Sequence, residues 1–364
     1  MTRIRLDLTR EQILAHRLSV NGLGERQPLS PASLRRAAWA GLQDSMPRAA
    51  LLSLHARIHG VGPATWEDRS LVQLWGPRFS AYVVAARDLA VFSLGRFPVA
   101  AKGQRTAEEL ASRLDAFLAG RRMAYGDAGE ALGEIPNRLR YAATTGRVLI
   151  RWEGARQPVV WTVPAPDIDP AAARLELARR YLHIFGPGTT SSFTGWAGIG
   201  TVDGRAAFDA IAGSLTAVRT PVGDGWILTS DEPAFRARAV NASPARLLPS
   251  GDAYFLSWGA DRVLLVPDAG HRADLWTSRV WPGAVLVEGE IVGTWRRAQG
   301  DVEIEPWRRF SPAVREAVEA EAATMPLADA ARIRVNWDVR DRGKGVEPSV
   351  APVSDGPRPP SIPG

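Results

Sequence analysis

Three polar side chains, Gln43, Asp44 and Ser45, stand between two segments whose apolar residues recur at helical spacing. An amide, a carboxylate and a hydroxyl side by side can orient a water molecule and set negative charge beside a developing cation, which is what hydrolysis needs. Asp and Ser also begin helices, because they accept hydrogen bonds from the free amides of the first turn, where Pro47 is tolerated. We favour capping of the helix over residues 46–58, since helix starts need such residues far more often than active sites do.

Other residue types offer little further chemistry. His55 and His59 are four residues apart, as paired metal ligands on a helix are, but no third ligand is evident, and the chain has five His and no Cys. The stretch Gly186-Pro187-Gly188 lacks the Lys and the preceding strand of a phosphate-binding loop, so we predict that it ends a helix. We therefore expect neither a metal nor a cofactor.

The charge of the chain suits an acidic partner. It has 45 Lys and Arg against 39 Asp and Glu, a net charge of +6 and a pI near 10.2. Only Lys102 and Lys344 are lysines, so arginine carries nearly all of the positive charge. Guanidinium groups bind phosphates in a two-pronged fashion and stack on bases, which suits nucleic acid. A genomic bias toward GC-rich codons would produce the same excess, so the placement of the arginines has to decide.

One order of elements recurs along the chain and is clearest in residues 101–166. Residues 106–118 open with Thr and Glu at capping-box spacing, 126–132 form a short second helix, and 136–144 open with Pro at a helix start. After Gly146 two alternating runs, RVLIRW and PVVWTV, flank a turn and predict a β-hairpin. Three helices followed by a hairpin are the order of a winged helix.

The same order is predicted on either side of this middle copy. The first copy, in residues 1–100, has an extra leading helix from Thr9 with Gln12 closing a capping box, and Ser30 caps its next helix. The stretch WEDRSLVQLWGPRFSAYVV supplies its last helix and a short hairpin. In the third copy, residues 167–243, helices are expected at 170–185, 189–199 and 203–213, before a hairpin around the turn PVGDG.

Arginines occur where winged helices would meet DNA. The third helix of such a unit enters the major groove, while the hairpin, or wing, follows the phosphates. The expected DNA contacts, drawn from all three units and from the end of a C-terminal hairpin, are Arg69, Arg78, Arg138, Arg140, Arg147, Arg151, Arg156, Arg205, Arg296 and Arg297. The alternative is that most of these arginines are solvated surface residues. Winged helices also serve as protein-protein modules.

Beyond residue 244 the composition turns to strands. Alternating apolar runs predict strands at 245–258, 261–267, 283–297 (a hairpin around Glu288-Gly289-Glu290), 301–307 and 332–339, with a helix at 311–326. The end of the chain, residues 339–364, is rich in Pro, Gly and Ser and predicts a disordered tail. We therefore expect an α+β protein of three tandem winged-helix units and a small β-rich, barrel-like unit with a helix, residues 244–338.

Several stretches together carry a family likeness. The three helical units, the segment LQDSMPRAALLSLHAR, RRYLHIFGPGTTSSFTGW and VLVEGEIVGTW resemble the winged-helix DNA-binding proteins that include the AlkZ and YcaQ DNA glycosylases. The resemblance covers residues 5–330. It implies that the winged helices form a concave basic surface, which the β-unit completes. It also implies that the substrate is DNA with alkylated purines, including interstrand crosslinks.

The resemblance also assigns a role to the polar triplet. It implies that the active site is a Gln-aliphatic-Gln or Gln-aliphatic-Asp triplet that holds water against C1′ of the sugar. Gln43 fits the first position, Asp44 replaces the aliphatic residue, and Ser45 stands where the second catalytic residue is expected. An alkylated purine leaves readily, so a held water and a nearby anion or dipole suffice, and Asp44 could supply the charge if the loop turned it inward. Ser45 alone would do neither well at neutral pH.

Two functions remain open, and both need the same fold. Our main expectation is double-stranded DNA binding linked to alkylated or crosslinked DNA; the alternative is a monofunctional DNA glycosylase that hydrolyses the N-glycosidic bond of N-alkylpurines or crosslinks. Transcriptional control is a weaker idea, because regulators that read paired half-sites usually gain their symmetry from dimers. The longest apolar runs fall short of the roughly 18 residues of a membrane span, and we expect a cytoplasmic monomer.

Overall fold

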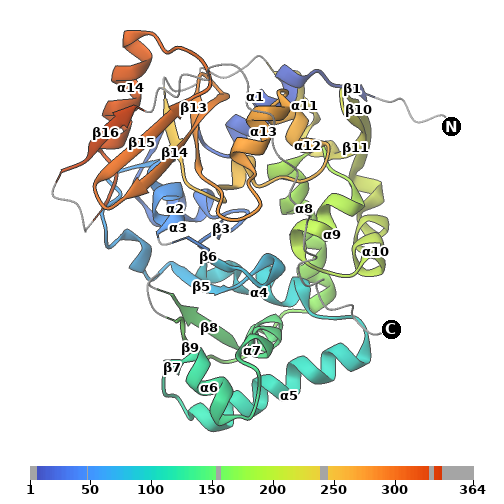
Figure 1. Ribbon diagram of the computed structural model, residues 1–364. Coiled ribbons are helices and arrows are strands. Elements are labelled where there is room, and N and C mark those ends of the chain that lie inside the picture. Colours follow the sequence, from blue (N-terminus) through green and yellow to red (C-terminus); the bar gives the residue numbers. More distant parts are fainter. Residues whose placement is uncertain (1–5, 47, 153–156, 238–244, 328–331, 338–364) are drawn as a thin grey trace, which may run out of the picture.

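The computed structural model describes residues 6–46, 48–152, 157–237, 245–327 and 332–337 (Figure 1). These residues form an α+β protein whose strands make several small sheets, which confirms the predicted fold class. The predicted tail and Arg156 lie outside the described residues. Within these ranges, no helix has the length and apolar character that crossing a membrane requires.

The N-terminal helices begin where their capping residues predict. Helix α1 (Arg10–Val20) starts after Thr9, and the Thr9 and Gln12 side chains exchange hydrogen bonds with each other's backbone amides. Ser30 and Ser33 do the same before α2 (Pro31–Ala37). Helix α3 (Ala49–His55) is buried along its whole length. Two short parallel strands, β2 (Gln27–Pro28) and β4 (Ile58–His59), join the chain before α2 to the end of α3.

A three-stranded sheet lies beside α3. Strand β3 (Leu42–Gln43) pairs with β6 (Ala81–Ala85), which pairs with β5 (Leu71–Trp75). In place of the helix predicted before this hairpin, the structure has a single 3-10 turn, η1 (Thr65–Glu67). The Asp68 carboxylate accepts hydrogen bonds from the amide and hydroxyl of Ser70 and turns the chain into β5.

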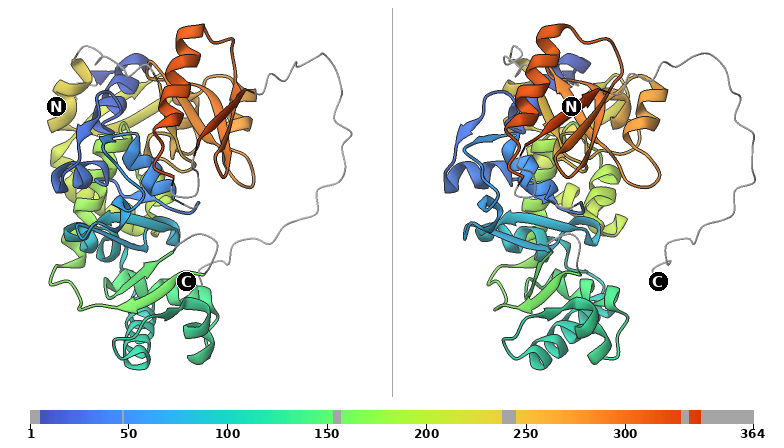
Figure 2. Two further views of the ribbon diagram at one scale, coloured as in Figure 1. Left: turned by 90° about the vertical axis from the view of Figure 1, so that its left-hand side faces the viewer. Right: turned by 60° about the vertical axis from the view of Figure 1, so that its left-hand side comes forward.

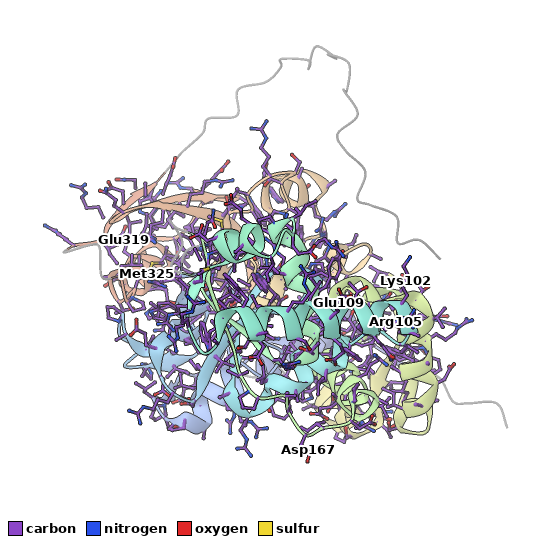
Figure 3. The ribbon with its side chains drawn as sticks, turned by 90° about the horizontal axis from the view of Figure 1, so that it is seen from below. Lys102, Arg105, Glu109, Asp167, Glu319 and Met325 are labelled. Atoms are coloured by element: carbon purple, nitrogen blue, oxygen red, sulfur yellow. The ribbon has the colours of Figure 1, made fainter. Side chains whose placement is uncertain are left out.

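The middle of the chain forms the lower part of the molecule in Figure 1. Its elements are the helices α5 (Ala101–Leu118), α6 (Tyr125–Ala131) and α7 (Leu139–Ala142) and a sheet of β7 (Met123–Ala124), β9 (Val159–Thr162) and β8 (Val148–Arg151). The predicted order is present, but α5 starts before the expected cap, Thr106, whose hydroxyl donates to the Lys102 carbonyl inside the helix. Seen from below, Lys102, Arg105 and Glu109 follow one another along α5 (Figure 3).

The next segment packs the largest aromatic side chains. Helices α8 (Pro170–Phe185), α9 (Thr190–Ala197) and α10 (Thr201–Ile211) precede the hairpin of β10 (Leu215–Thr220) and β11 (Gly223–Leu228), as predicted. Strand β1 (Leu6–Asp7) adds to β10 in parallel. Helix α8 ends at Gly186, as expected, and Tyr181, Phe193 and Trp196 are buried between α8 and α9. Helix α4 (Leu89–Ser93) and a short α11 (Glu232–Arg236) flank this segment.

The C-terminal region is built on one mixed sheet. Its order is β12 (Arg246–Leu248), β13 (Gly283–Val287), β14 (Glu290–Ala298), β15 (Asp301–Pro306) and β16 (Arg334–Trp337). The predicted hairpin is confirmed, with Glu288 and Gly289 at positive φ in its turn. Helix α14 (Pro312–Ala323) is also confirmed, and it packs on this sheet (Figure 2).

Three predictions for this region are wrong. The strand expected over residues 245–258 is limited to β12, because Ala253–Phe255 form a 3-10 turn, η9. Residues 261–267, expected as a strand, contain the helix α12 (Asp261–Leu265), and α13 (Ala269–Leu275) starts at a capping Asp268 that we did not single out. A short buried apolar run does not by itself distinguish a strand from a helix. The barrel-like closure is also wrong within the described residues, because β12 and β16 each pair with one neighbour and leave the sheet open.

A buried ion pair joins the N-terminal helices to the C-terminal region. The guanidinium of Arg57, just after α3, donates to both oxygens of Asp252 at 2.7 and 2.8 Å, and the Ser53 hydroxyl donates to one of them at 2.6 Å. Burial would raise the pKa of Asp252, but Arg57, Ser53 and the Tyr254 amide together hold that pKa below its usual value. This cluster fixes α3 against the loop that follows β12.

Replacing Asp252 with Ala should lower the free energy of unfolding by about 3 kcal/mol or more, because Arg57 would be left buried without its counter-ion. Urea titration of both proteins measures the change. The exposed Asp209→Ala on α10 is the matched control and should change stability by less than about 0.5 kcal/mol. Equal stability of the two variants would contradict the role given to this pair.

Candidate active site

The side chains of Gln43 and Ser45 meet at the end of β3. Strand β3 places them on one side of the chain and Asp44 on the other, because side chains alternate along extended backbone. The Gln43 amide nitrogen donates to the Ser45 hydroxyl oxygen at 3.2 Å. Both residues are partly exposed, whereas Asp44 is buried. The structure therefore brings together the first and third residues of the triplet and separates the second from them.

The orientation of Gln43 is set by Arg78. The guanidinium of Arg78 donates to the Gln43 amide oxygen at 3.0 Å, and a guanidinium can only donate, so the amide NH2 must face Ser45. Arg78 also donates to the Trp196 carbonyl and lies over the Trp258 ring, 4.2 Å from its centre. Arg78, which we predicted to contact DNA, is thus held by residues from two other regions of the chain and fixes the candidate site.

A cavity of about 300 Å³ begins at Met46, the residue after the triplet, while Gln43, Asp44 and Ser45 are not among its lining residues. The loop after β12 forms one wall, and Gly251 in it approaches Gln43 so closely that an added Cβ would lie 3.2 Å from the amide carbon. Its lining residues come from the start of α3, this loop, and the strands β13 and β14: Met46, Ala49, Leu52, Pro249, Ser250, Val280, Trp281, Pro282, Gly283, Trp295, Arg296 and Arg297. The cavity is therefore apolar with two arginines at its edge, a composition suited to a base or sugar beside phosphates.

Asp44 is a buried structural carboxylate in this fold. One oxygen accepts from the Ala50 amide in the first turn of α3 at 3.0 Å, and the other accepts from the Gln73 amide nitrogen at 2.7 Å. The N-cap residue of α3 is Arg48, which makes no side-chain capping bond, so neither Asp44 nor Ser45 is the predicted N-cap, although Asp44 does accept from an amide of the first turn. Burial raises the pKa of Asp44 to about 6, and the two donors together with Arg48 and Arg151 limit the rise. Its burial weighs against the catalytic role predicted for it, because neither oxygen faces the cavity.

Arg48 and Trp66, two residues near the triplet, escaped the sequence analysis. The guanidinium of Arg48 lies 3.8 Å from the centre of the Trp66 ring, and that of Arg151 lies 3.4 Å from the same centre. Trp66 is buried, and Arg151 also pairs with Glu67 at 3.0 Å. Cation-π contacts between residues far apart in sequence leave no periodic signal, so only the fold reveals this cluster.

The arginines predicted to bind DNA lie in different surroundings. Arg296 and Arg297 line the cavity, and Arg69 and Arg205 are exposed. Three others form contacts within the middle region and its neighbours: Arg138 pairs with Glu134, Arg147 pairs with Asp115 and Glu108, and Arg140 donates to the Phe79 carbonyl. Arg151 joins the Trp66 cluster. None of these contacts tests DNA binding, which stays a prediction for each of these arginines.

The arrangement of Gln43 and Ser45 can hold a water molecule. The Gln43 NH2 has a second hydrogen, and the Ser45 hydroxyl can donate or accept, so the pair offers complementary partners to one water. No acidic residue or His is among those lining the cavity, so a general base is not part of this set. Such a site suits a substrate whose leaving group departs without help. The described residues contain no group of three or more side chains arranged to hold a metal ion.

Comparison with known proteins decides the family. The family model of the DNA glycosylases described as AlkZ-like matches residues 36–326, which include the triplet, the cavity and the sheet beside it. The chain belongs to the AlkZ-like DNA glycosylase family. The predicted resemblance is confirmed, and this membership supports the glycosylase alternative better than our main expectation of DNA binding without chemistry.

Two matches from Streptomyces sahachiroi, one by sequence and one by solved structure, extend this finding. One is named an interstrand DNA cross-link repair glycosylase and is 25% identical over 218 residues, which cover 52% of this chain and 58% of that protein. The chain thus matches somewhat more than half the length of that relative. The solved structure of the DNA glycosylase AlkZ superposes with a TM-score of 0.72 at 17% identity, covering 92% of this chain and all of that one. At this identity the likeness shows a shared fold.

Replacing Asp44 with Asn should change how stability depends on pH. The pKa of Asp44 is about 6 in the folded protein, against 3.8 for the reference carboxyl group, so wild type takes up a proton as pH falls between these values. Its free energy of unfolding should therefore rise by about 2 kcal/mol relative to the variant between pH 7 and pH 4. Urea titrations at several pH values measure this difference. Burial lowers the pKa of His16 and of His55, but both histidines are present in wild type and variant, so their contributions cancel. A difference that stays flat would contradict the burial of this charge.

Proposed function

We propose that this protein is a DNA glycosylase that hydrolyses the N-glycosidic bond of N-alkylated purines in double-stranded DNA, including those within interstrand crosslinks. The observation that carries the proposal is the hydrogen-bonded pair of Gln43 and Ser45, which is oriented by Arg78 and directly precedes Met46, a residue that lines the cavity. Membership of the AlkZ-like family supports the same reaction, as does the name of the Streptomyces relative.

The proposed chemistry uses a water molecule between Gln43 and Ser45. An N7- or N3-alkylated purine carries a positive charge, which is neutralised when the electron pair of the glycosidic bond departs with the base. The held water then adds its oxygen to C1′ of the sugar cation and loses a proton to solvent. The amide dipole of Gln43, fixed by Arg78, orients the water in advance, which replaces part of the missing carboxylate.

Ser45 restricts which lesions this site can process. A serine hydroxyl does not take up a proton at neutral pH, so the site gives little help to a neutral leaving group. Uncharged bases would need an acid to protonate them, and the lining of the cavity provides none. The proposal is therefore confined to bases that alkylation has already made cationic.

We further propose that the three helix-helix-helix-hairpin segments, residues 1–100, 101–166 and 167–243, are tandem winged helices that grip the duplex, with residues 244–338 closing the site. The order of elements in the middle and third segments supports this, as does the short third strand in each small sheet: β3, β7 and β1. The expectations of a monomer and of a cytoplasmic location stay predictions, and sedimentation with and without duplex tests the first.

Base release tests the activity directly. Under single-turnover conditions the wild type should release N7-methylguanine from a duplex that carries one such base. Gln43→Ala should slow release by about a hundredfold or more, and Ser45→Ala by about tenfold, because each removes one partner of the water. Gln104→Ala on α5 is the matched control and should leave the rate unchanged. A wild type that binds the duplex without releasing the base would make the triplet a helix joint in a DNA-binding protein.

The arginines beside the cavity should contribute to DNA binding through phosphates. Replacing both Arg296 and Arg297 with Ala should weaken binding to undamaged duplexes of any sequence and reduce the slope of log K against log salt by about 2. Arg236→Ala on the remote helix α11 is the control. An unchanged slope in the double variant would remove β14 from the DNA-binding surface.

A further inference from the structure

The buried side of the triplet is connected to the hairpin of the middle region through one side chain, Gln73 on β5. Its amide nitrogen donates to Asp44 at 2.7 Å, and its amide oxygen accepts from the Trp152 backbone amide at 2.6 Å. Gln73 is 4% exposed. Figure 1 shows why this is possible, since β8 runs next to β5 where the two regions meet. A single buried amide thus joins the loop of Gln43 and Ser45 to the first residue beyond β8.

A second connection runs parallel to this one. Arg48, on the loop after the triplet, and Arg151, the last residue of β8, both stack on the ring of Trp66. The positive charges of the same two arginines act on the Asp44 carboxylate. The groups that face Asp44 therefore come from its own loop, from β5 and from β8. Any shift of β8 would disturb both the hydrogen bonds and the charges that hold the loop.

This connection depends on the residue by which the triplet departs from its family pattern. An aliphatic side chain at position 44 could accept no hydrogen bond from Gln73, and the buried Gln73 amide would lose a partner at a cost of about 1–3 kcal/mol. Asp44 and Gln73 are thus matched to each other, since the carboxylate only accepts and the amide supplies both a donor and an acceptor.

We propose that Gln73 is a positioning residue, which couples the hairpin of β8 and β9 to the water-holding pair Gln43 and Ser45 through Asp44. When the hairpin is seated on DNA, the Trp152 amide, Gln73 and Asp44 hold the loop in the geometry needed for hydrolysis. The inference rests on the proposed glycosylase for its effect on rate, but the coupling itself requires only that the protein binds DNA.

Exchanging the two side chains tests the match. Gln73→Glu sets two carboxylates against each other, so base release should slow at least tenfold at pH 8 and recover as the pH is lowered, when one proton is shared between the two groups. Asp44→Asn sets two amides together and should also slow release. The double variant restores every hydrogen bond, because the Asn amide donates to the Glu carboxylate while Glu accepts from Trp152. Its rate should return to within about threefold of wild type.

The outcome of this exchange is decisive either way. Losses that simply multiply in the double variant would overturn the proposal, because they would mean that Asp44 and Gln73 act independently. Duplex affinity serves as a second readout and should change less than twofold in all three variants, since none of these side chains is placed against DNA. A loss of affinity that matches the loss of rate would indicate misfolding of the hairpin instead of mispositioning of the loop, and would also overturn the proposal.

Hydrogen exchange tests the coupling without any catalysis. Adding an undamaged duplex to wild type should slow amide exchange both in residues 148–152 and in residues 44–52. In Gln73→Leu, slowing should persist in the hairpin segment and be lost in the loop segment. Persistence in both segments would overturn the coupling even if base release is observed. Coupled exchange without base release would leave the coupling intact and reject only the glycosylase.

Discussion

A charge can be buried only where donors surround it, and the carboxylate of Asp44 imposes this requirement on the centre of the molecule. Its oxygens take the Ala50 amide at the start of α3 and the Gln73 amide on β5, so a helix and a strand must both come to this point. With Asp44 turned inward, the pleat of the chain directs Gln43 and Ser45 to the other, partly exposed side. The position of the candidate site thus follows from the need to satisfy a side chain that is not exposed to solvent.

Under the proposed function, the departure from the triplet that the resemblance implies has two separate effects. Asp44 strengthens the support beneath the loop, while Ser45 weakens the chemistry that the loop can perform. Arg78 offsets part of that weakness by fixing the amide of Gln43, but its positive charge close to the sugar would oppose the oxocarbenium ion. Under the proposed function, this balance favours lesions that bring their own positive charge and depart unaided.

Much of the fold follows from local signals. The capping box at Thr9, the cap at Ser30 and the hairpin turn at Glu288 and Gly289 were predicted because each is decided by a few neighbouring residues. The family likeness located the triplet in the same way. The helix α12 was missed because its five residues carry too little periodicity to be told from a strand. Arg78, Gln73 and Trp66 were not linked to the site, since their partners lie far away in the sequence and only packing brings them together.

Positions around the cavity differ in how far their residues can be replaced, and Gly251 is a restricted one. Its φ of +77° strains any residue that has a Cβ, and its approach to Gln43 leaves little space for one, so the loop after β12 is constrained where it meets Gln43. The opposite rim is made of large side chains, Met46, Trp281 and Trp295, each of which can be shortened without strain in the backbone. Relatives that accept bulkier adducts would therefore be expected to diverge along this rim, and engineered breadth of substrate would begin there.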